Sequence, residues 1–494
     1  MKPDYRIFWE SAGGCVPAHW NFVPIADLLE NPKSISVGVM YPGADTLGGV
    51  PLVRVSDVKD GAVAQCPEFC VSHEVDEEYK RSRFNGTELL ITLVGNPGDC
   101  AIVSKEMAGW NAARALAVVR LKDPGLRPWL RYVLLSKPAK HLIDARLNTT
   151  VQKTLNLKDI KELAVPIPPH DERDRIADIV GGLEKKIVFN RQINQTLEQI
   201  AQTLFKSWFV DFEPVKAKIE AKSKWFDGSS PSGRGGGEGL REAQLRAAMC
   251  AISGKLEPEL DQLSPEQYQQ LAATAALFPD GLVESELGLI PVGWEVSEIG
   301  QEVTVVGGST PSTANPDFWD GKFAWVTPKD LSRISEKVLT GSERTISAAG
   351  VSKISSGQLP VGTVLLSSRA PIGYLALSMI PVSINQGFIA MICNKRLPNT
   401  YVLQWATTSL DSIKQRGSGT TFAEISKSNF RPMGVLVPGT EVLDSFQQLV
   451  LPLYEQITAS VSEVDSLATL RDTLLPKLLS GELAVESPRL EATA

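Results

Sequence analysis

The stretch Thr149–Pro168, TTVQKTLNLKDIKELAVPIP, recurs in the second half of the chain as Thr420–Pro438, TTFAEISKSNFRPMGVLVP. The two copies are 271 residues apart at their start and 270 at their end. Each copy runs directly into a long helical pattern, which begins near Asp171 and near Glu441. So long an interval excludes a solenoid of short repeats and predicts two large modules, each followed by a helix.

The same interval relates further pairs along the chain. The tetrapeptide PAHW at 17–20 is followed 274 positions later by PVGW at 291–294, and Pro97 and Asn111 pair with Pro371 and Asn385 at the same spacing. The dipeptides at 57–58 and 330–331 are 273 apart. We therefore expect a duplicated domain-plus-helix, a two-fold object made from one chain that suits a target with two halves.

Composition and charge limit the possible classes of protein. A length of 494 residues suggests about three domains, and no run of 18 apolar residues or signal peptide is present. We expect a soluble cytoplasmic protein, because the six cysteines form no regular framework. The net charge of −7 argues against nucleic-acid binding. However, residues 15–170 carry a net charge of +1 and residues 291–440 one of +3, so the rest of the chain carries −11. DNA contacts within the repeated parts are thus allowed.

Short strand patterns and turns alternate with helical patterns in both repeated parts. We expect strands at 50–58, 88–94, 100–103 and 116–121, and helices at 128–136 and 158–163. The second part should have strands at 323–327, 362–366, 374–377 and 387–392 and a helix at 400–416. This mixture predicts an α+β fold with two repeated α/β domains. Their predicted bounds are 15–170 and 291–440, after an N-terminal arm at 1–14.

Heptad-like apolar stripes follow each domain, at 171–214 and 441–482, before a tail at 483–494. Two such stripes in one chain predict that the two helices pack antiparallel as a coiled coil. Asn190 could fix the register of this coiled coil. About 38 residues would make a rod of about 57 Å. Pro452 and Pro476 should kink or end the second helix, and the alternative is that each helix covers only its own domain. The predicted seam consists of Val180, Leu183, Ile187, Leu197, Leu204, Trp208, Leu453, Ile457, Val464, Leu467 and Leu474.

Residues 215–290 have no counterpart in the other half. The segment 228–239, GSSPSGRGGGEG, has the composition of a flexible linker. Helices are expected at 240–253 and 264–277, the latter with Ser264 as N-cap. The whole region reads as an insertion that hinges the two halves.

The sequence contains no complete motif for catalysis, metal binding or nucleotide binding. Residues 315–318, NPDF, only partly match the base-holding loop of amino-methyltransferases and read as a surface turn. The glycines at 233–239 do not form a dinucleotide cradle, no P-loop is present, and Glu184-Lys185-Lys186 lies in the helical stripe rather than after a strand. Cys66, Cys70 and His73 lack a fourth metal ligand. We expect no metal, no cofactor and no active site in this chain.

Several segments identify a family. Residues 198–214, EQIAQTLFKSWFVDFEP, preceded by IVFNRQIN at 187–194, strongly resemble the central helical region of the specificity (S) subunit of type I restriction-modification systems. Residues 470–483, LRDTLLPKLLSGEL, look like that family's distal helical region. The openings at 16–20 and 290–294, the turn GGSTPS at 307–312, and the segments at 41–58 and 417–430 are similar to parts of its target-recognition domains. The resemblance covers essentially the whole chain.

This resemblance implies a non-catalytic subunit of a DNA methyltransferase and endonuclease complex in bacterial defence. The two domains would each read half of a split, asymmetric DNA sequence in the major groove, and the helices would be the spacer. Two methyltransferase (M) subunits and motor-nuclease (R) subunits would be partners, carrying S-adenosylmethionine, ATP and Mg²⁺ and methylating adenine. Residues 32–38, PKSISVG, replace the GGSTPS turn in the first domain, which fits two different half-sites but weakens the transfer of residue roles between the copies.

Loop residues with hydrogen-bonding or cationic side chains are the DNA-binding candidates. A phosphate contact is the more expected role for Arg and Lys, whereas the threonines that recur in both copies could serve the fold. The candidates are Arg81, Arg83, Arg146, Asn148, Thr149, Thr150 and Lys153 in the first domain, and Arg369, Asn385, Gln386, Arg416, Ser418, Thr420 and Thr421 in the second.

Two other classes of protein stay open from the sequence. The first is an enzyme, a fused methyltransferase or nuclease, which the missing cofactor loops oppose. The second is a scaffold or decayed homologue that docks methyltransferase subunits without reading DNA, which the uninterrupted repeat opposes.

Overall fold

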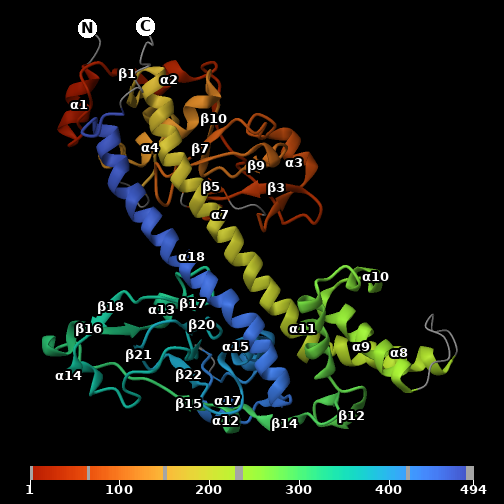
Figure 1. Ribbon diagram of the computed structural model, residues 1–494. Coiled ribbons are helices and arrows are strands. Elements are labelled where there is room, and N and C mark those ends of the chain that lie inside the picture. Colours follow the sequence, from red (N-terminus) through yellow and green to blue (C-terminus); the bar gives the residue numbers. More distant parts are fainter. Residues whose placement is uncertain are drawn as a thin grey trace, which may run out of the picture. The chain divides into compact units, whose positions relative to one another are not determined.

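The computed structural model describes residues 4–59, 61–63, 67–147, 153–227, 237–418 and 423–485. The chain divides into two compact units, one of residues 1–187 with 466–494 and one of residues 188–465. Helices α7 (His170–Phe209) and α18 (Thr440–Ser480) each contribute to both units (Figure 1). No helix of the described residues is long and apolar enough to cross a membrane.

The first unit has three small sheets with the strand orders β2-β10-β7-β8, β6-β3-β9 and β1-β11, and a two-stranded ribbon β4-β5. Its strands are β1 (Asn21–Pro24), β2 (Ile35–Val37), β3 (Val50–Val53), β4 (Val58–Lys59), β5 (Ala62–Val63), β6 (Cys70–Val71), β7 (Leu89–Thr92), β8 (Cys100–Ile102), β9 (Asn111–Ala112), β10 (Leu116–Val119) and β11 (Ala164–Ile167). Its short helices are α1 (Tyr5–Ser11), α2 (Ile25–Leu28), α3 (His73–Glu78), α4 (Arg127–Leu135), α5 (Lys137–Asp144) and α6 (Leu157–Glu162).

The second unit repeats these strand orders as β15-β22-β19-β20, extended by β17, and as β18-β16-β21 and β14-β23. Its strands are β14 (Glu295–Glu298), β15 (Thr304–Val306), β16 (Trp319–Val326), β17 (Val338–Leu339), β18 (Arg344–Ile346), β19 (Val364–Ser367), β20 (Leu375–Ser378), β21 (Val382–Ile384), β22 (Phe388–Ile392) and β23 (Gly434–Val437). The accompanying helices are α12 (Ile299–Glu302), α13 (Pro328–Leu331), α14 (Ala348–Val351), α15 (Asn399–Thr408), α16 (Leu410–Gln415) and α17 (Lys427–Phe430). The duplication in sequence is therefore a duplication of topology.

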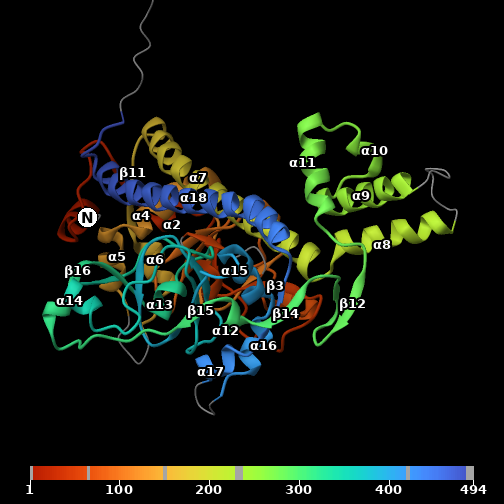
Figure 2. The same ribbon diagram turned by 60° about the horizontal axis from the view of Figure 1, so that its bottom comes forward.

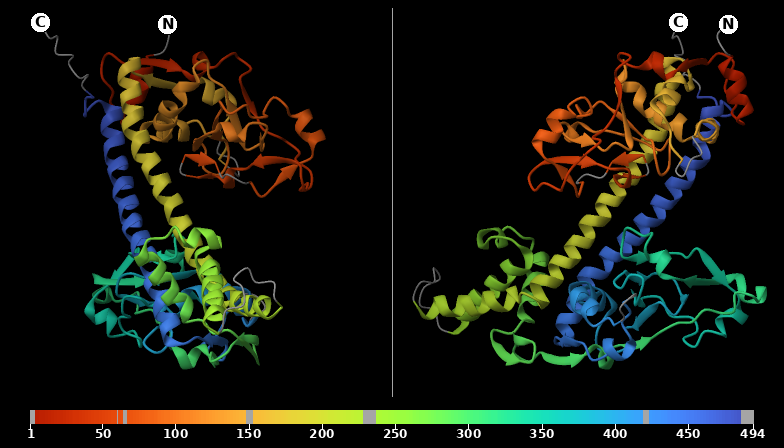
Figure 3. Two further views of the ribbon diagram at one scale, coloured as in Figure 1. Left: turned by 45° about the vertical axis from the view of Figure 1, so that its right-hand side comes forward. Right: turned by 180° about the vertical axis from the view of Figure 1, so that it is seen from behind.

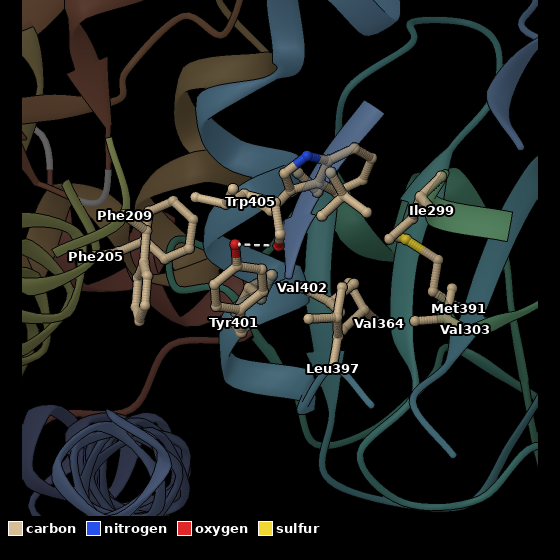
Figure 4. Close-up of a cluster of buried hydrophobic side chains, with 14 of the residues drawn as sticks. Phe205, Phe209, Ile299, Val303, Val364, Met391, Leu397, Tyr401, Val402 and Trp405 are labelled. Carbon is tan, nitrogen blue, oxygen red and sulfur yellow. Dashed lines mark hydrogen bonds between the residues drawn. The ribbon is translucent and has the colours of Figure 1, made fainter. Parts of the chain in front are cut away.

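The two cores use the same anchoring contact. In the first unit the indole N–H of Trp129, on α4, donates to the carbonyl of Pro166 at 2.8 Å. In the second the hydroxyl of Tyr401, on α15, donates to the carbonyl of Leu436 at 2.8 Å (Figure 4). Both aromatic side chains are fully buried. Since a buried Trp or Tyr needs a partner for its polar atom, this bond fixes each α-helix against the returning strand.

The two long helices are antiparallel within the second unit. The amide of Asn190 on α7 donates to Glu463 on α18 at 2.8 Å, whereas Trp208, later in α7, lies against Phe446, earlier in α18, at 5.9 Å between ring centroids. Asn190 is 3% exposed, which is the expected setting for a polar residue that fixes register. The hydroxyl of Ser460 donates to the Asn190 carbonyl at 3.5 Å. These two residues are 270 apart, so equivalent positions of the repeated helices contact each other.

The predicted seam is buried only in part. Val180, Ile187, Trp208, Ile457 and Val464 are buried, whereas Leu183, Leu197, Leu204, Leu453, Leu467 and Leu474 are half-buried. The buried positions of α7 that lie outside the predicted seam include Asn194, Ala201 and Phe205. Phe205 contacts Phe209, Tyr401 and Phe446, with ring centroids 5.1–6.0 Å apart (Figure 4). The helices thus pack both on each other and on the domains, so neither alternative for their packing holds alone.

Three local predictions need correction. Helix α18 is continuous through Pro452 and Pro476, so neither proline ends it. The expected strand at 50–58 breaks after β3, where Val55–Asp57 form a 3₁₀ turn before β4. The expected helix at 400–416 divides at Ser409 into α15 and α16.

The region after α7 is a packed helical group rather than only a hinge. It contains α8 (Glu213–Phe226), α9 (Gly237–Ser253), α10 (Glu257–Leu260), α11 (Pro265–Ala276) and the hairpin β12 (Leu282–Ser285)–β13 (Gly288–Pro291), all within the second unit (Figure 2). The Ser264 side chain caps α11 as predicted. The Lys218 ammonium donates to the buried Phe278 carbonyl. In the views of Figures 1 and 3, α8–α11 and the sheet β15-β22-β19-β20-β17 lie on opposite sides of α7 and α18. The predicted linker residues 228–236 lie outside the described residues.

The predicted N-terminal arm, residues 1–14, contains helix α1. Its Asp4 side chain accepts from the Arg6 N–H as an N-cap, and Trp9 is 3% exposed in the core of the first unit. The Arg6 guanidinium donates to the carbonyls of Val16 and Trp20 at 3.0 Å each. These contacts attach the arm to the entry of the first domain.

Candidate nucleic-acid interface

Two strand ends bring candidates of the second domain together. Strands β19 and β22 are antiparallel with Ser367 opposite Phe388, and the Ser368 N–H extends the ladder by donating to the Gly387 carbonyl at 2.8 Å. Arg369 follows Ser368 and Gln386 precedes Gly387, so these two residues come next at the ends of the two strands and lie at the same edge of the sheet. Arg369 is half-buried and Gln386 is exposed.

A third segment reaches the same edge. Arg369 and Ser418 each form an isolated antiparallel bridge with Glu424. The Arg369 Nη1 lies 3.9 Å from the Glu424 Oε2, with side chains 38% and 48% exposed. An ion pair that is so open to water contributes little, so the guanidinium can exchange this carboxylate for a phosphate or a base edge.

The GGSTPS turn meets Gln386. The Thr310 hydroxyl donates to the Gln386 Oε1 at 2.7 Å, which uses the amide oxygen and not the amide N–H donors. Gly308 comes so close to the Ile384 carbonyl that a Cβ atom there would lie 1.9 Å from its oxygen. Glycine is thus required for this approach. By contrast, the Asn385 Oδ1 accepts from the Gly387 N–H at 2.9 Å, which is a local role in the fold.

The remaining candidates of this domain are less informative. Arg416 is exposed, follows α16, and its Nη1 reaches the Asn429 carbonyl at 3.5 Å. Thr420 and Thr421 lie outside the described residues. Arg369, Gln386 and Ser418 are the candidates that the structure brings together at one edge.

The first-domain candidates differ in how strongly the fold already holds them. Arg83 is bonded to the buried Asp76 and lies 2.9 Å from Glu77, and the bond to Asp76 raises the pKa of its guanidinium. It therefore has a structural partner. Arg146 donates to the Leu142 carbonyl at 2.7 Å, one turn earlier. Arg81 and Lys153 are exposed. Asn148, Thr149 and Thr150 lie outside the described residues.

The matching backbone contacts correct one equivalence between the domains. The Ala113 N–H donates to the Val53 carbonyl at 2.8 Å, as the Asn385 N–H donates to the Val326 carbonyl at 3.1 Å. Ala113 is thus the counterpart of Asn385, whereas Asn111 is buried with its amide on Asp76 at 2.8 Å. The interval between the two copies is two residues shorter at this point, so the constant spacing wrongly paired Asn385 with Asn111.

The corrected equivalence reveals a residue that the sequence analysis missed. The residue after Ala113 is Arg114, which is exposed and takes the place of Gln386. The counterpart of Arg369 is Val94, since Val94 bridges Thr154 as Arg369 bridges Glu424. Only a superposition of the two domains could identify Arg114, because the loop sequences around it are not alike.

The motifs set aside in the sequence have structural roles where they are described. The Asn315 side chain accepts from the Asp317 N–H in a surface turn. Glu184 accepts from the Tyr132 hydroxyl at 3.1 Å and pairs with Arg131, so it joins α7 to α4. Among the described residues no group of His, Cys, Asp and Glu could hold a metal. Cys66 lies outside them.

Comparison with known proteins agrees with the duplicated topology. The family model described as "Type I restriction modification DNA specificity domain" matches residues 17–199 and 291–458. The type I restriction enzyme HindI specificity subunit of Haemophilus influenzae is 33% identical over 480 residues, covering 94% of this chain and 99% of that one. The MjaIX specificity subunit of Methanocaldococcus jannaschii is 35% identical over 176 residues, 34% of this chain and 41% of that one.

Among solved structures, the type I restriction-modification S subunit of M. genitalium has a TM-score of 0.48 at 14% identity, covering 93% of this chain and 96% of that one. The two matches of the family model begin 274 residues apart, the interval that separates PAHW from PVGW. They include both sets of repeated sheets and the first part of each long helix. The chain belongs to the DNA specificity subunits of type I restriction enzymes.

Proposed function

We propose that this specificity subunit reads a bipartite, asymmetric DNA sequence, with one half-site for each of its two recognition domains. The observation that supports this most directly is the repeated sheet order, which holds different side chains at equivalent edge positions. Arg114 replaces Gln386, and Val94 replaces Arg369. Arg favours the acceptor pair of guanine and Gln the donor–acceptor pair of adenine, so equivalent edges can select different bases.

Helices α7 and α18 would set the gap between the half-sites. With 40 and 41 residues they are each about 60 Å long at about 1.5 Å per residue. One turn of DNA separates equivalent groove faces by about 34–36 Å. The helices are therefore long enough to define a spacer of at least one turn.

The chemistry would belong to partner subunits. Two methyltransferase subunits would bind this chain with S-adenosylmethionine and methylate adenine in each half-site, and motor-nuclease subunits with ATP and Mg²⁺ would complete a restriction complex. The role of this chain is then to choose the sequence, through phosphate contacts that position it and base contacts that specify.

Methylation mapping tests this proposal. The full chain is co-expressed with its methyltransferase subunit in a host that lacks adenine methylation, and modified adenines are mapped by single-molecule sequencing. We expect one motif with two unlike halves and a fixed gap. A matched pair of variants assigns the edges: Arg114→Ala should relax only one half-site and Gln386→Ala only the other.

The alternative is a scaffold that binds methyltransferase subunits without reading DNA. It predicts a complex of normal composition that leaves DNA unmethylated or methylates it without a motif. Either result would refute the proposed function, and purification of the complex would show that assembly had occurred.

A further inference from the structure

Close backbone contacts show which turn of the first domain corresponds to GGSTPS. A Cβ atom on Gly38 would lie 2.0 Å from the Ala112 carbonyl oxygen, and one on Gly308 would lie 1.9 Å from the Ile384 carbonyl oxygen. Glycine is required at both places for the same close approach. Residues 37–42, VGVMYP, are therefore the counterpart of GGSTPS, which corrects the expectation that PKSISVG takes its place.

This turn places Met40 beside the exposed Arg114. The Arg114 N–H donates to the Val39 carbonyl at 2.9 Å in a parallel bridge. Met40 and Arg114 are thus the next residues on two paired segments, which lie about 4.8 Å apart. In the second domain the residues at these two places are in direct contact, since the Thr310 hydroxyl donates to Gln386 at 2.7 Å.

The side chains of the first-domain turn are apolar and open to water. Met40 is 39% exposed and Tyr41 is 75% exposed. With Leu47, they are the large hydrophobic side chains that are exposed among the described residues of 15–170. The second domain has the hydroxyl of Thr310 where the first has Met40. Single exposed hydrophobic residues are ordinary, but a pair held beside a candidate reading position requires an explanation.

The guanidinium of Arg114 is available to a ligand. Among the described residues its side chain forms neither a hydrogen bond nor an ion pair, and Met40 offers it no oxygen. Gln386, by contrast, already accepts a hydrogen bond from Thr310. All five N–H donors of Arg114 can therefore turn to the N7 and O6 acceptors of a guanine.

We propose that Met40 and Tyr41 form an apolar contact for the C5 methyl group of a thymine, beside the guanine that Arg114 would read, an inference that rests on the proposed function. Thymine is the base that carries an apolar group in the major groove. Successive base pairs are about 3.4 Å apart, less than the spacing of the two paired segments, so the turn reaches a base pair next to the one that Arg114 contacts. The first half-site then contains a thymine beside a guanine.

Replacement of thymine by uracil tests this contact, because uracil lacks only the methyl group. The first half-site is the one that Arg114→Ala relaxes in methylation mapping. Duplexes that carry the mapped motif, with uracil in place of each thymine of that half-site in turn, are titrated with the assembled complex of the full chain and the methyltransferase subunit. Loss of one buried methyl group should weaken binding about fourfold at one position.

Two variants assign this effect to the turn. Met40→Thr with Tyr41→Ser gives it hydroxyl side chains, so this double variant should bind the thymine and uracil duplexes equally. Leu47→Ser is the matched control. Leu47 is exposed on the same loop, but the preceding Thr46 donates its N–H to Cys70 of β6, which lies on the other side of β3 from β9. The control should keep the fourfold preference for thymine.

A thymine preference that the double variant loses and the control keeps supports the inference. Equal binding of the unaltered complex to all the duplexes overturns it, as does a first half-site without thymine or a preference that the double variant retains. Failure of the double variant to assemble with the methyltransferase subunit also overturns it, because the apolar pair would then contact protein. In all these cases a single bipartite motif in the mapping leaves the proposed function standing, whereas the absence of any motif refutes that function as well.

Discussion

Replacing the buried Phe205 by Ala should destabilise the second unit more than truncation of an exposed or half-buried side chain of α7. Phe205 is 2% exposed and contacts three aromatic rings, Phe209, Tyr401 and Phe446, which come from α7, α15 and α18. It therefore joins both long helices to the second recognition domain. Truncation of a buried Phe to Ala costs about 3–5 kcal/mol, which includes the cavity that remains.

The corresponding thermal shift is large enough to measure. For domains of this size about 1 kcal/mol lowers the melting temperature by roughly 2 °C or more, so the expected decrease is at least about 6 °C. The melting temperature is measured by differential scanning calorimetry of the full chain. The controls are Leu204→Ala, which is half-buried, and Ile200→Ala, which is 43% exposed on the same helix.

The order of the three variants decides the result. We expect Phe205→Ala to have the largest effect, Leu204→Ala an intermediate one and Ile200→Ala almost none. A larger decrease for Leu204→Ala than for Phe205→Ala would refute the packing described here and restore the seam predicted from the heptad pattern.

Three further results are expected. Lys337→Met should lower the melting temperature by an amount equivalent to about 3 kcal/mol, because the ammonium lies 3.0 Å from Glu198, whose side chain is only 16% exposed, whereas the exposed Lys322→Met should be neutral. Arg396 lowers the pKa of the buried Glu302 below its ordinary 4.5. The stability that this pair contributes is therefore complete above pH 4.5 and is lost as the pH falls through the lowered pKa. Glu302→Gln should flatten the acid side of the plot of stability against pH, and an unchanged plot would contradict this. Arg369→Ala should reduce the salt dependence of DNA binding by the assembled complex by about one unit of slope, whereas Arg83→Ala should leave the slope unchanged.

The sequence predicts the duplicated topology because an interval of about 270 residues is a long-range signal that tolerates local change. It predicts individual equivalences less well, since a slip of two residues is enough to pair Asn385 with the buried Asn111 instead of Ala113. Exposed Arg114 could not be found in this way. Its place follows from the backbone contact of the preceding residue, Ala113, to Val53, which the surrounding sequence does not encode in a recognisable motif.

The seam of the long helices shows a different limit. A search for Leu and Ile at heptad spacing passes over Ala201 and Asn194, although both are fully buried, because small and polar residues do not contribute to an apolar stripe. Asn194 instead donates to Glu336 of the second domain, at 3.4 Å. The helix face is thus shaped by the domain that packs on it, and that information lies far away in the sequence.

The two halves share the sheets whose edges carry the candidate DNA contacts, and they differ in the segment that follows α7. The sheets and their edges recur in both, whereas α8–α11 have no counterpart among the described residues of the first half. A target with two similar duplex halves requires only repeated reading domains. The insertion with α8–α11, which the sequence suggests as a hinge, has no counterpart in the described part of the first half, so it lies outside the duplicated arrangement that would read the two half-sites.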